Sequence, residues 1–141
     1  MRVVIDTNVL VAGLIGKKGP NREILRRCLI GDLQPFVGNA LYLEYLDLLN
    51  REHIQVLCNQ TSVSLMTFLD GFASVCTAVD AHYLWRPNLQ DEADNHVIEI
   101  AIAARASYLI TNNLSDFANA ELRHIGFEVV TPQQLLRLLE P

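Results

Sequence analysis

The sequence predicts an α/β domain whose central, mostly parallel sheet is covered by helices on both faces. Short apolar runs alternate along the chain with longer amphipathic stretches, which is the pattern of parallel strands joined by helices. Half of the 141 residues are hydrophobic, enough for a sizeable core. No repeat or linker divides the chain, so we expect a single domain over residues 1–141.

The first three elements follow this alternation. Residues 2–5 form a short apolar strand, and residues 9–15 form an apolar helix. Glycines and a proline break the chain at 16–20. Asn21 then has the side chain to cap a second helix over 22–30, which Gly31 ends.

The remaining elements repeat the pattern of apolar strand and amphipathic helix. Residues 34–37 are a candidate strand, and Asn39 is expected to cap a strong helix through Arg51. The segment 78–84 fits either strand or loop, and Pro87 ends any regular structure nearby. The later elements are strands at 108–110 and 127–130 and helices at 61–76, 97–105 and from Pro132 onward.

Charge and cysteine content exclude several classes of protein. The net charge is −5, from 11 Lys+Arg and 16 Asp+Glu, which argues against binding nucleic acid by overall positive charge. It leaves room for acids gathered around bound cations. Cys28, Cys58 and Cys76 have no zinc-ligand or disulfide spacing and are expected to be buried thiols in a reducing cytoplasm. Without a signal-peptide pattern or a membrane-spanning run, we expect a cytoplasmic protein with no membrane contact.

Four acids occupy corresponding places in the predicted sheet. Asp6 ends the first strand, and Glu44 lies one turn into the helix after the second strand. Asp94 stands at the start of the 97–105 helix, and Asp116 lies in the loop after the strand at 108–110. In a parallel sheet the strand ends and the following helix starts lie along one edge, so these acids can share a pocket.

Carboxylates in one pocket repel each other unless protons or cations lie between them. Mg²⁺ and Mn²⁺ prefer such oxygen ligands, and two such ions can activate a water and neutralise charge on a phosphodiester. The chemistry that fits is phosphodiester hydrolysis. Each acid alone has an ordinary explanation: Asp6 or Asp94 as a helix cap, Asp116 as a loop-ordering residue, and Glu44 as part of an acidic helix face.

The sequence resembles the PIN domain, a metal-dependent nuclease fold, and most resembles the toxin nucleases of VapC-type toxin–antitoxin pairs. The resemblance spans the whole chain in the expected order. Its most specific parts are Val-Val-Ile-Asp-Thr-Asn-Val-Leu at 3–10 and the Thr-x-Asn-x-x-Asp-Phe loop within 108–117. The other matching segments lie at 39–49, 94–104 and 129–136.

The resemblance implies roles for particular residues. Asp6, Glu44 and Asp94 match the three catalytic acids that hold the Mg²⁺ or Mn²⁺ ion, and Asp116 matches a more variable fourth. Two polar residues beside the first acid, Thr7 and Asn8, match the pair that orders the site. Asn113 stands where many relatives carry an Asp, so it is a metal ligand, a supporting group or a substrate contact.

The resemblance also implies a function and partners. It predicts a Mg²⁺- or Mn²⁺-dependent endoribonuclease that hydrolyses RNA, the toxin of a toxin–antitoxin pair, with a small antitoxin protein as partner and a homodimeric state. A stand-alone nuclease of the same fold acting in RNA processing or on DNA, and a catalytically silent relative that binds nucleic acid, are the alternatives.

Two other functions agree less well with the residues. A phosphatase with Asp6 as nucleophile needs a second acid two residues later, where this chain has Asn8. A nucleotide-binding module needs a Gly-x-Gly-x-x-Gly or Walker loop, and the chain has neither.

The candidate substrate contacts are basic. Four residues are possible nucleic-acid contacts or, equally, a solvated face: Lys17, Lys18, Arg22 and Arg26.

Two further residues lie near Asp94 in the sequence. His96, two residues after Asp94, is expected to be a surface histidine, and Asp91 is a reserve metal ligand.

Overall fold

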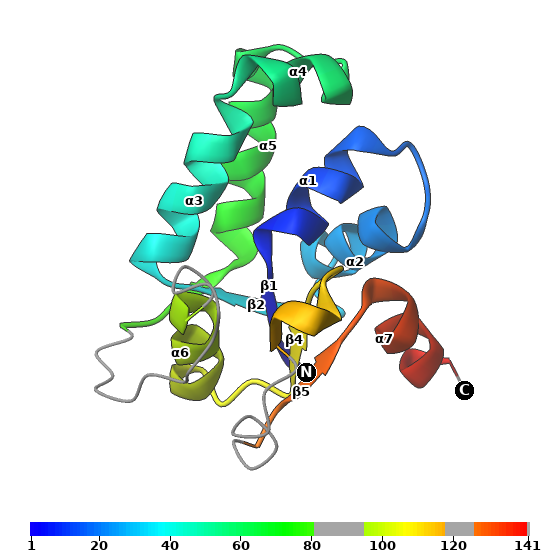
Figure 1. The fold of residues 1–141 in the computed structure, drawn as a ribbon, viewed down its shortest axis with the longest axis vertical. Helices are drawn as coiled ribbons and strands as arrows, with labels where there is room; N and C mark the ends of the chain where they lie inside the picture. Colours follow the sequence, from blue (N-terminus) through cyan, green and yellow to red (C-terminus); the bar gives the residue numbers. More distant parts are fainter. Residues whose placement is uncertain (81–94, 118–125, 141) are drawn as a thin grey trace.

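A computed structural model describes residues 1–80, 95–117 and 126–140. In these ranges an all-parallel sheet has the strand order β3-β2-β1-β4-β5 and is flanked by seven α-helices (Figure 1). The predicted α/β class is therefore confirmed. The strands are β1 (Arg2–Ile5), β2 (Gln34–Val37), β3 (Thr77–Ala78), β4 (Tyr108–Ile110) and β5 (Glu128–Val130).

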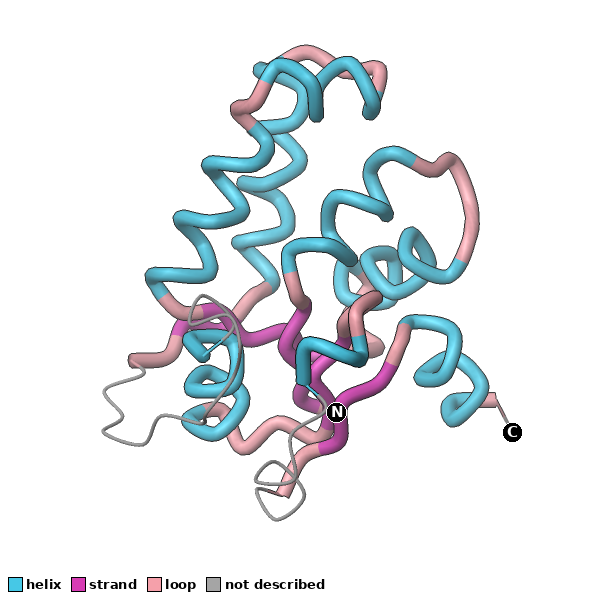
Figure 2. Tube along the Cα trace, viewed as in Figure 1, coloured by secondary structure: helices cyan, strands magenta, loops and turns pink. Residues whose placement is uncertain are grey.

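The helices surround the strands, which meet in the middle of the molecule (Figure 2). None of the helices in the described ranges is long and apolar enough to cross a membrane. Their bounds are α1 (Thr7–Ile15), α2 (Pro20–Leu29), α3 (Asn39–Leu49), α4 (Glu52–Cys58), α5 (Ser62–Val75), α6 (Asn95–Ala103) and α7 (Pro132–Leu139), with a short 3-10 helix, η2 (Leu114–Phe117).

The central strand β1 forms the middle of the core. Val3 and Val4 are fully buried, as expected for a strand with neighbours on both sides and helices over the sheet. β1 pairs with β2 on one side and β4 on the other, with Ile5 opposite Ile110. Because β1 and β4 end in register, the residues that follow them, Asp6 and Thr111, emerge side by side.

Five predicted helix starts, those of α1, α2, α3, α5 and α6, are wrong by one or two residues. α2 begins at Pro20 rather than after Asn21, because proline is favoured at the first helical position, where its missing N–H is not needed. Gly19 precedes it with φ +124°, a backbone conformation that glycine adopts readily. α3 has Gly38 rather than Asn39 at its N-cap, without a side-chain cap hydrogen bond.

The predicted helix through Arg51 ends two residues earlier than expected, and a second, short helix follows it. α3 ends at Leu49, and the short α4, which the sequence did not predict, follows and leads into α5. α3 and α5 pack side by side, with α4 at their far end (Figure 1). The segment 78–84 starts at the end of the two-residue strand β3, while residues 81–84 and Pro87 lie outside the described residues.

Candidate active site

The candidate site lies where the direction of strand progression reverses. From β1 the chain adds β2 and β3 on one side of the sheet, and β4 and β5 on the other. The carboxyl ends of β1 and β4 therefore flank a topological switch point, the place where ligands bind in open α/β sheets. The Asp6 N–H donates to the Ile110 carbonyl at 2.9 Å and holds the two strand ends together.

Asp6 caps α1 and presents a buried carboxylate at this point. Its residue exposure is 5%, and its Oδ1 accepts from the Thr7 N–H at 2.8 Å. Its Oδ2 accepts from the Thr111 hydroxyl at 2.8 Å and from Asn8 Nδ2 at 3.3 Å. Both oxygens are thus oriented by neighbours, as a metal ligand or a catalytic base requires.

Glu44 reaches the same point from α3. The Thr7 hydroxyl donates to Glu44 Oε1 and also lies 3.3 Å from Asp6 Oδ1. One hydroxyl therefore lies within hydrogen-bonding distance of both carboxylates, although the two acids stand 38 positions apart in the sequence. The predicted convergence of these two acids is present in the structure.

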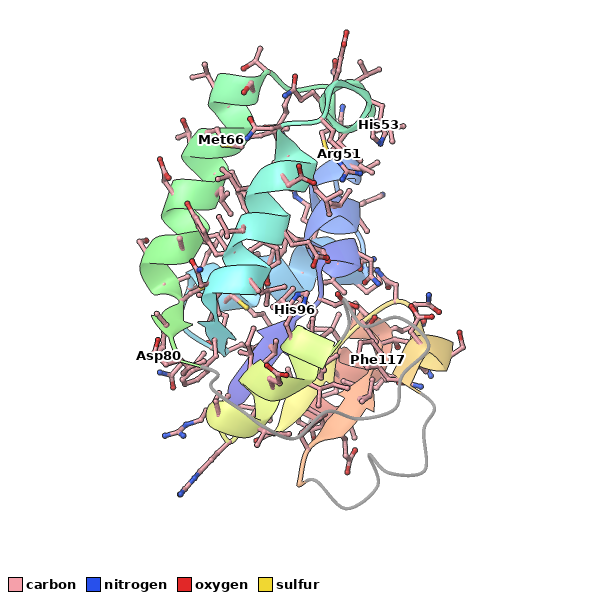
Figure 3. All side chains as sticks on the ribbon, turned by 60° about the vertical axis from the view of Figure 1, so that its left-hand side comes forward. Arg51, His53, Met66, Asp80, His96 and Phe117 are labelled. Carbon is pink, nitrogen blue, oxygen red and sulfur yellow. The ribbon has the colours of Figure 1, made fainter. Side chains whose placement is uncertain are left out.

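His96 of α6 lies on the other side of Glu44. Its Nε2 is 3.1 Å from Glu44 Oε2, and its side chain is only 20% exposed. Figure 3 shows His96 near the centre of the molecule, where α6 meets α3, and His53 at the far end. α6 packs closely against the start of α3 because Gly38 has no side chain there. A Cβ at Gly38 would lie only 3.0 Å from Ile100 Cγ1 of α6. The prediction of a surface histidine at position 96 is therefore wrong.

Tyr45 anchors Glu44 to the strand end. Its side chain is buried, and its hydroxyl donates to the Ile5 carbonyl, one residue before Asp6. Burial raises the pKa of Tyr45 well above its usual value, so the hydroxyl keeps its proton and remains a donor. This bond fixes α3 relative to β1 and so fixes the distance between the two acids.

Thr111 is a site residue that the sequence analysis did not single out. It is fully buried at the end of β4, and its hydroxyl donates to Asp6. The same oxygen accepts from Asn8 Nδ2 at 3.2 Å and from the Asn113 N–H at 3.1 Å. Its position directly after a predicted strand, as Asp6 directly follows the first strand, could have indicated that Thr111 belongs to the site.

The electrostatics of the two acids differ. Burial raises the pKa of Asp6, and the nearby Glu44 charge adds to this, against the lowering effect of the Thr111 and Thr7 hydrogen bonds. The neighbouring His96 lowers the pKa of Glu44, helped by Thr7 and opposed by burial. A cation between the two carboxylates would relieve both the burial penalty and the repulsion on Asp6.

The chain matches a known protein family over most of its length. Residues 2–115 match the PIN domain, and this range contains β1, α3, α6 and β4, the elements that carry the site. The chain belongs to the PIN domain family. PIN domains are generally nucleases and typically use divalent metal ions. No curated protein matches the chain.

The third predicted acid of this PIN domain, Asp94, lies outside the described residues. It immediately precedes α6, the helix whose His96 contacts Glu44. Within residues 1–80, 95–117 and 126–140, no three His, Cys, Asp or Glu side chains lie close enough to hold a metal ion together. The described part of the site therefore supplies the pair Asp6 and Glu44.

Asp116 is connected to this pair through Asn113. In η2, Asp116 Oδ2 accepts from Asn113 Nδ2 at 2.7 Å, and the Asn113 N–H donates to Thr111. Asn113 Oδ1 in turn accepts from the Ser115 hydroxyl at 2.9 Å. The amide of Asn113 is thus directed at Asp116, so it orients this acid.

Asn8 extends the same network. Its Oδ1 accepts from the Asn112 N–H at 3.0 Å, while its Nδ2 contacts Asp6 and Thr111. Thr7 and Asn8 both contact the carboxylate of Asp6, which is the ordering role that the sequence predicted for them.

The four residues predicted as nucleic-acid contacts lie in the α1–α2 connection and along α2. The guanidinium of Arg22 donates to the Gly16 carbonyl at 2.9 Å, and Arg26 forms a two-bond pair with Glu23 at 2.6 and 2.8 Å. All four line one groove: Lys17, Lys18, Arg22 and Arg26.

Proposed function

We propose that this PIN domain is a Mg²⁺- or Mn²⁺-dependent endoribonuclease that hydrolyses RNA. The observation that supports this most is the pair of carboxylates, Asp6 and Glu44, joined by the Thr7 hydroxyl at the switch point of the sheet. Without a cation, the ionised form of Asp6 is unfavourable, because the carboxylate is buried beside a second carboxylate and its pKa is raised. A cation between the two carboxylates would make the ionised form favourable.

The residues present fit a hard divalent ion. Asp6 and Glu44 offer carboxylate oxygens, the donors that Mg²⁺ and Mn²⁺ prefer, and no described cysteine lies among them. We propose that Asp94 and Asp116 complete the donor set. When bound, such an ion lowers the pKa of water and stabilises charge on the phosphodiester.

The surrounding side chains would act by orientation. Thr111 and Asn8 hold one oxygen of Asp6, and Thr7 holds the other. The Nε2 of His96 lies 3.1 Å from the second oxygen of Glu44. These contacts reduce the motion of the ligands, and loss of such supporting bonds typically costs about 10–100-fold in metal affinity or activity.

The test is cleavage of labelled RNA by the purified chain with Mg²⁺, with Mn²⁺, and with EDTA. We expect cleavage with a metal and none with EDTA, and we expect Glu44→Gln to lose it. Asp47→Asn is the matched control, because Asp47 lies on the same helix, exposed, and pairs with Arg51 instead. Cleavage in EDTA at the same rate as with Mg²⁺ or Mn²⁺ would contradict metal dependence. The same assay with single-stranded DNA tests whether RNA is the preferred substrate.

We further propose that the chain is the toxin of a toxin–antitoxin pair in a reducing cytoplasm, and that it forms a homodimer. The resemblance in the opening motif and the 108–117 loop supports the toxin role, and the free thiols of Cys28 and Cys58 support the compartment. A toxin role predicts that a small antitoxin protein is encoded beside the chain and that its co-expression restores growth of cells arrested by the chain. Growth that is unaffected by the chain alone would favour a stand-alone nuclease.

A further inference from the structure

We propose that a basic groove between the α1–α2 hairpin and α5 binds an unpaired stretch of RNA that flanks the cleaved bond. This inference rests on the ribonuclease function proposed above. It adds a second binding surface to the acidic site and names the substrate class as single-stranded RNA.

The basic groove has a volume of about 550 Å³, within the range of about 300–1,000 Å³ usual for ligand sites. Its apolar floor includes Leu14, Leu25 and Phe68. Its polar rim carries four cations: Lys17, Lys18, Arg22 and Arg26. A groove with an apolar floor and a cationic rim suits an occupant that has both flat apolar groups and negative charge.

Positive charge is concentrated here although the chain is acidic overall. Four of the 11 Lys+Arg line the groove, and Arg27 lies beside them in α2, whereas the chain has a net charge of −5. Glu23, the one acid among the groove-lining residues, is already paired with Arg26 and Arg27. In the part of the chain that the structure describes, no carboxylate pairs with Lys17 or Lys18. The two lysines are therefore available to an anion such as a phosphate.

The floor offers a surface for a nucleobase. Phe68 lines the groove and is half-buried, and its ring is stacked on Phe72 with centroids 6.1 Å apart and planes 11° from parallel. A ring fixed in this way is a suitable stacking platform for a base. In a duplex the base faces are covered by the neighbouring base pairs and cannot stack on a side chain, so this floor favours an unpaired strand.

The groove is connected to the acidic site. α1 starts at its cap Asp6 and spans about 14 Å at about 1.5 Å per residue, ending beside the groove residues Leu14 and Lys17. In addition, Asn21 in the first turn of α2 accepts from Asn112 Nδ2 at 2.7 Å, next to Thr111. A few linked nucleotides can span this distance, so one RNA strand can occupy the groove and reach the acidic site.

The test measures binding of a labelled single-stranded oligoribonucleotide in EDTA, where no cleavage is expected. The double variant Lys17→Ala/Lys18→Ala should weaken binding about tenfold. The slope of log binding constant against log salt concentration should become shallower by about 1.4, because each lost phosphate contact removes about 0.7 for a single strand. Arg137→Glu on α7 is the control, because it lowers the net charge by the same two units outside the groove. It should bind as the wild type does.

A second pair of variants tests the floor. Phe68→Leu should weaken binding at least about fivefold through loss of stacking, and Phe68→Trp should retain it. Circular dichroism of each variant checks that the fold is kept. Together with the lysine variant, this pattern separates stacking from charge.

The outcomes separate this proposal from the ribonuclease proposal. If the wild type cleaves RNA but the lysine variant binds RNA as well as Arg137→Glu does, the groove is not a substrate site and the ribonuclease stands. Equal affinity for duplex RNA, or displacement of the strand by an acidic peptide that itself binds more tightly, would overturn the groove proposal as well. If the wild type cleaves no RNA with either metal, the ribonuclease proposal is overturned, and the assignment of the groove to substrate falls with it.

Discussion

At the residue scale, Asp6 is both a helix cap and the centre of the acidic site. Its Oδ1 satisfies the Thr7 N–H at the start of α1, and its Oδ2 accepts from the buried Thr111 hydroxyl. Its carboxylate is buried and has a raised pKa, so the charged form is maintained at a cost in the absence of a cation.

This cost makes a prediction about stability. A carboxyl whose pKa is higher in the folded than in the unfolded state binds its proton more tightly when folded. Its contribution to stability therefore falls as pH rises from 3.8 through the folded pKa of Asp6, and stays low at neutral pH. Without metal at pH 7, Asp6→Asn should melt at or above the wild-type temperature by calorimetry. A lower melting temperature at pH 7 with an unchanged value at pH 3 would contradict the raised pKa.

Thr111 makes a second prediction at this scale. Thr111→Val keeps the shape but removes the hydroxyl that orients Asp6 and accepts from Asn8 and Asn113. We expect Mn²⁺ affinity measured by isothermal titration calorimetry to fall about 10–100-fold. Thr111→Ser, which retains the hydroxyl, should stay close to the wild type. Equal affinity of the Val and wild-type proteins would show that Thr111 does not support the site.

At the element scale, the position of Glu44 depends on how α3 is attached to β1. The Tyr45 hydroxyl bonds the Ile5 carbonyl, and Glu44 is the adjacent residue on α3. Tyr45→Phe leaves a buried carbonyl without its donor and should destabilise the fold by about 1–3 kcal/mol in urea unfolding. It should also lower Mn²⁺ affinity, because α3 can shift relative to Asp6.

Tyr42→Phe provides the matched control for this prediction. Tyr42 lies three residues earlier on α3, and its hydroxyl makes no hydrogen bond within the described residues. Its loss should change stability by less than about 0.5 kcal/mol. A similar effect of the two variants would mean that ring packing, rather than the bond to Ile5, carries the role of Tyr45.

The sequence predicted most elements but not their ends. β1, β2 and β4 match the predicted ranges because short apolar runs between turn residues have few alternative structures. The start of α2 was misplaced because Pro20 serves as a breaker in sequence patterns and as a first helical residue in structures. The short α4 was missed because seven residues give too little periodicity to identify.

At the scale of the whole molecule, the strand order creates the site. Asp6 follows β1, Glu44 comes from α3, and Thr111 follows β4, so three distant segments meet at one switch point. The hydrogen bond between Thr111 and Asp6 joins residues 105 positions apart. The positions of the acids relative to the predicted strands indicated that Asp6 and Glu44 meet at this edge of the sheet, as they do in the structure. The sequence pattern did not predict Thr111, Tyr45 and His96, whose roles depend on side-chain contacts made only after folding.

Metal binding can be read from the stability of the whole domain. A ligand that binds only the folded state stabilises it by about 2.7 kcal/mol at a concentration of about 100 times its Kd. We expect Mn²⁺ to raise the melting temperature of the wild type and to leave the melting temperature of Asp94→Asn unchanged. Asp91→Asn, three positions earlier in the sequence, should respond like the wild type. If Asp91→Asn loses the shift and Asp94→Asn keeps it, Asp91 is the ligand instead.

The most direct measurement is the rate of Mn²⁺-dependent RNA cleavage by the wild type and by Asp6→Asn under identical conditions. Asp6→Asn nearly preserves shape while removing the charge that lies between Thr7, Thr111 and Glu44. We expect cleavage to fall more than about a hundredfold, beyond the loss typical of a supporting residue, with the fold intact by circular dichroism. Cleavage by Asp6→Asn at the wild-type rate would contradict the assignment of this carboxylate pair as the catalytic centre.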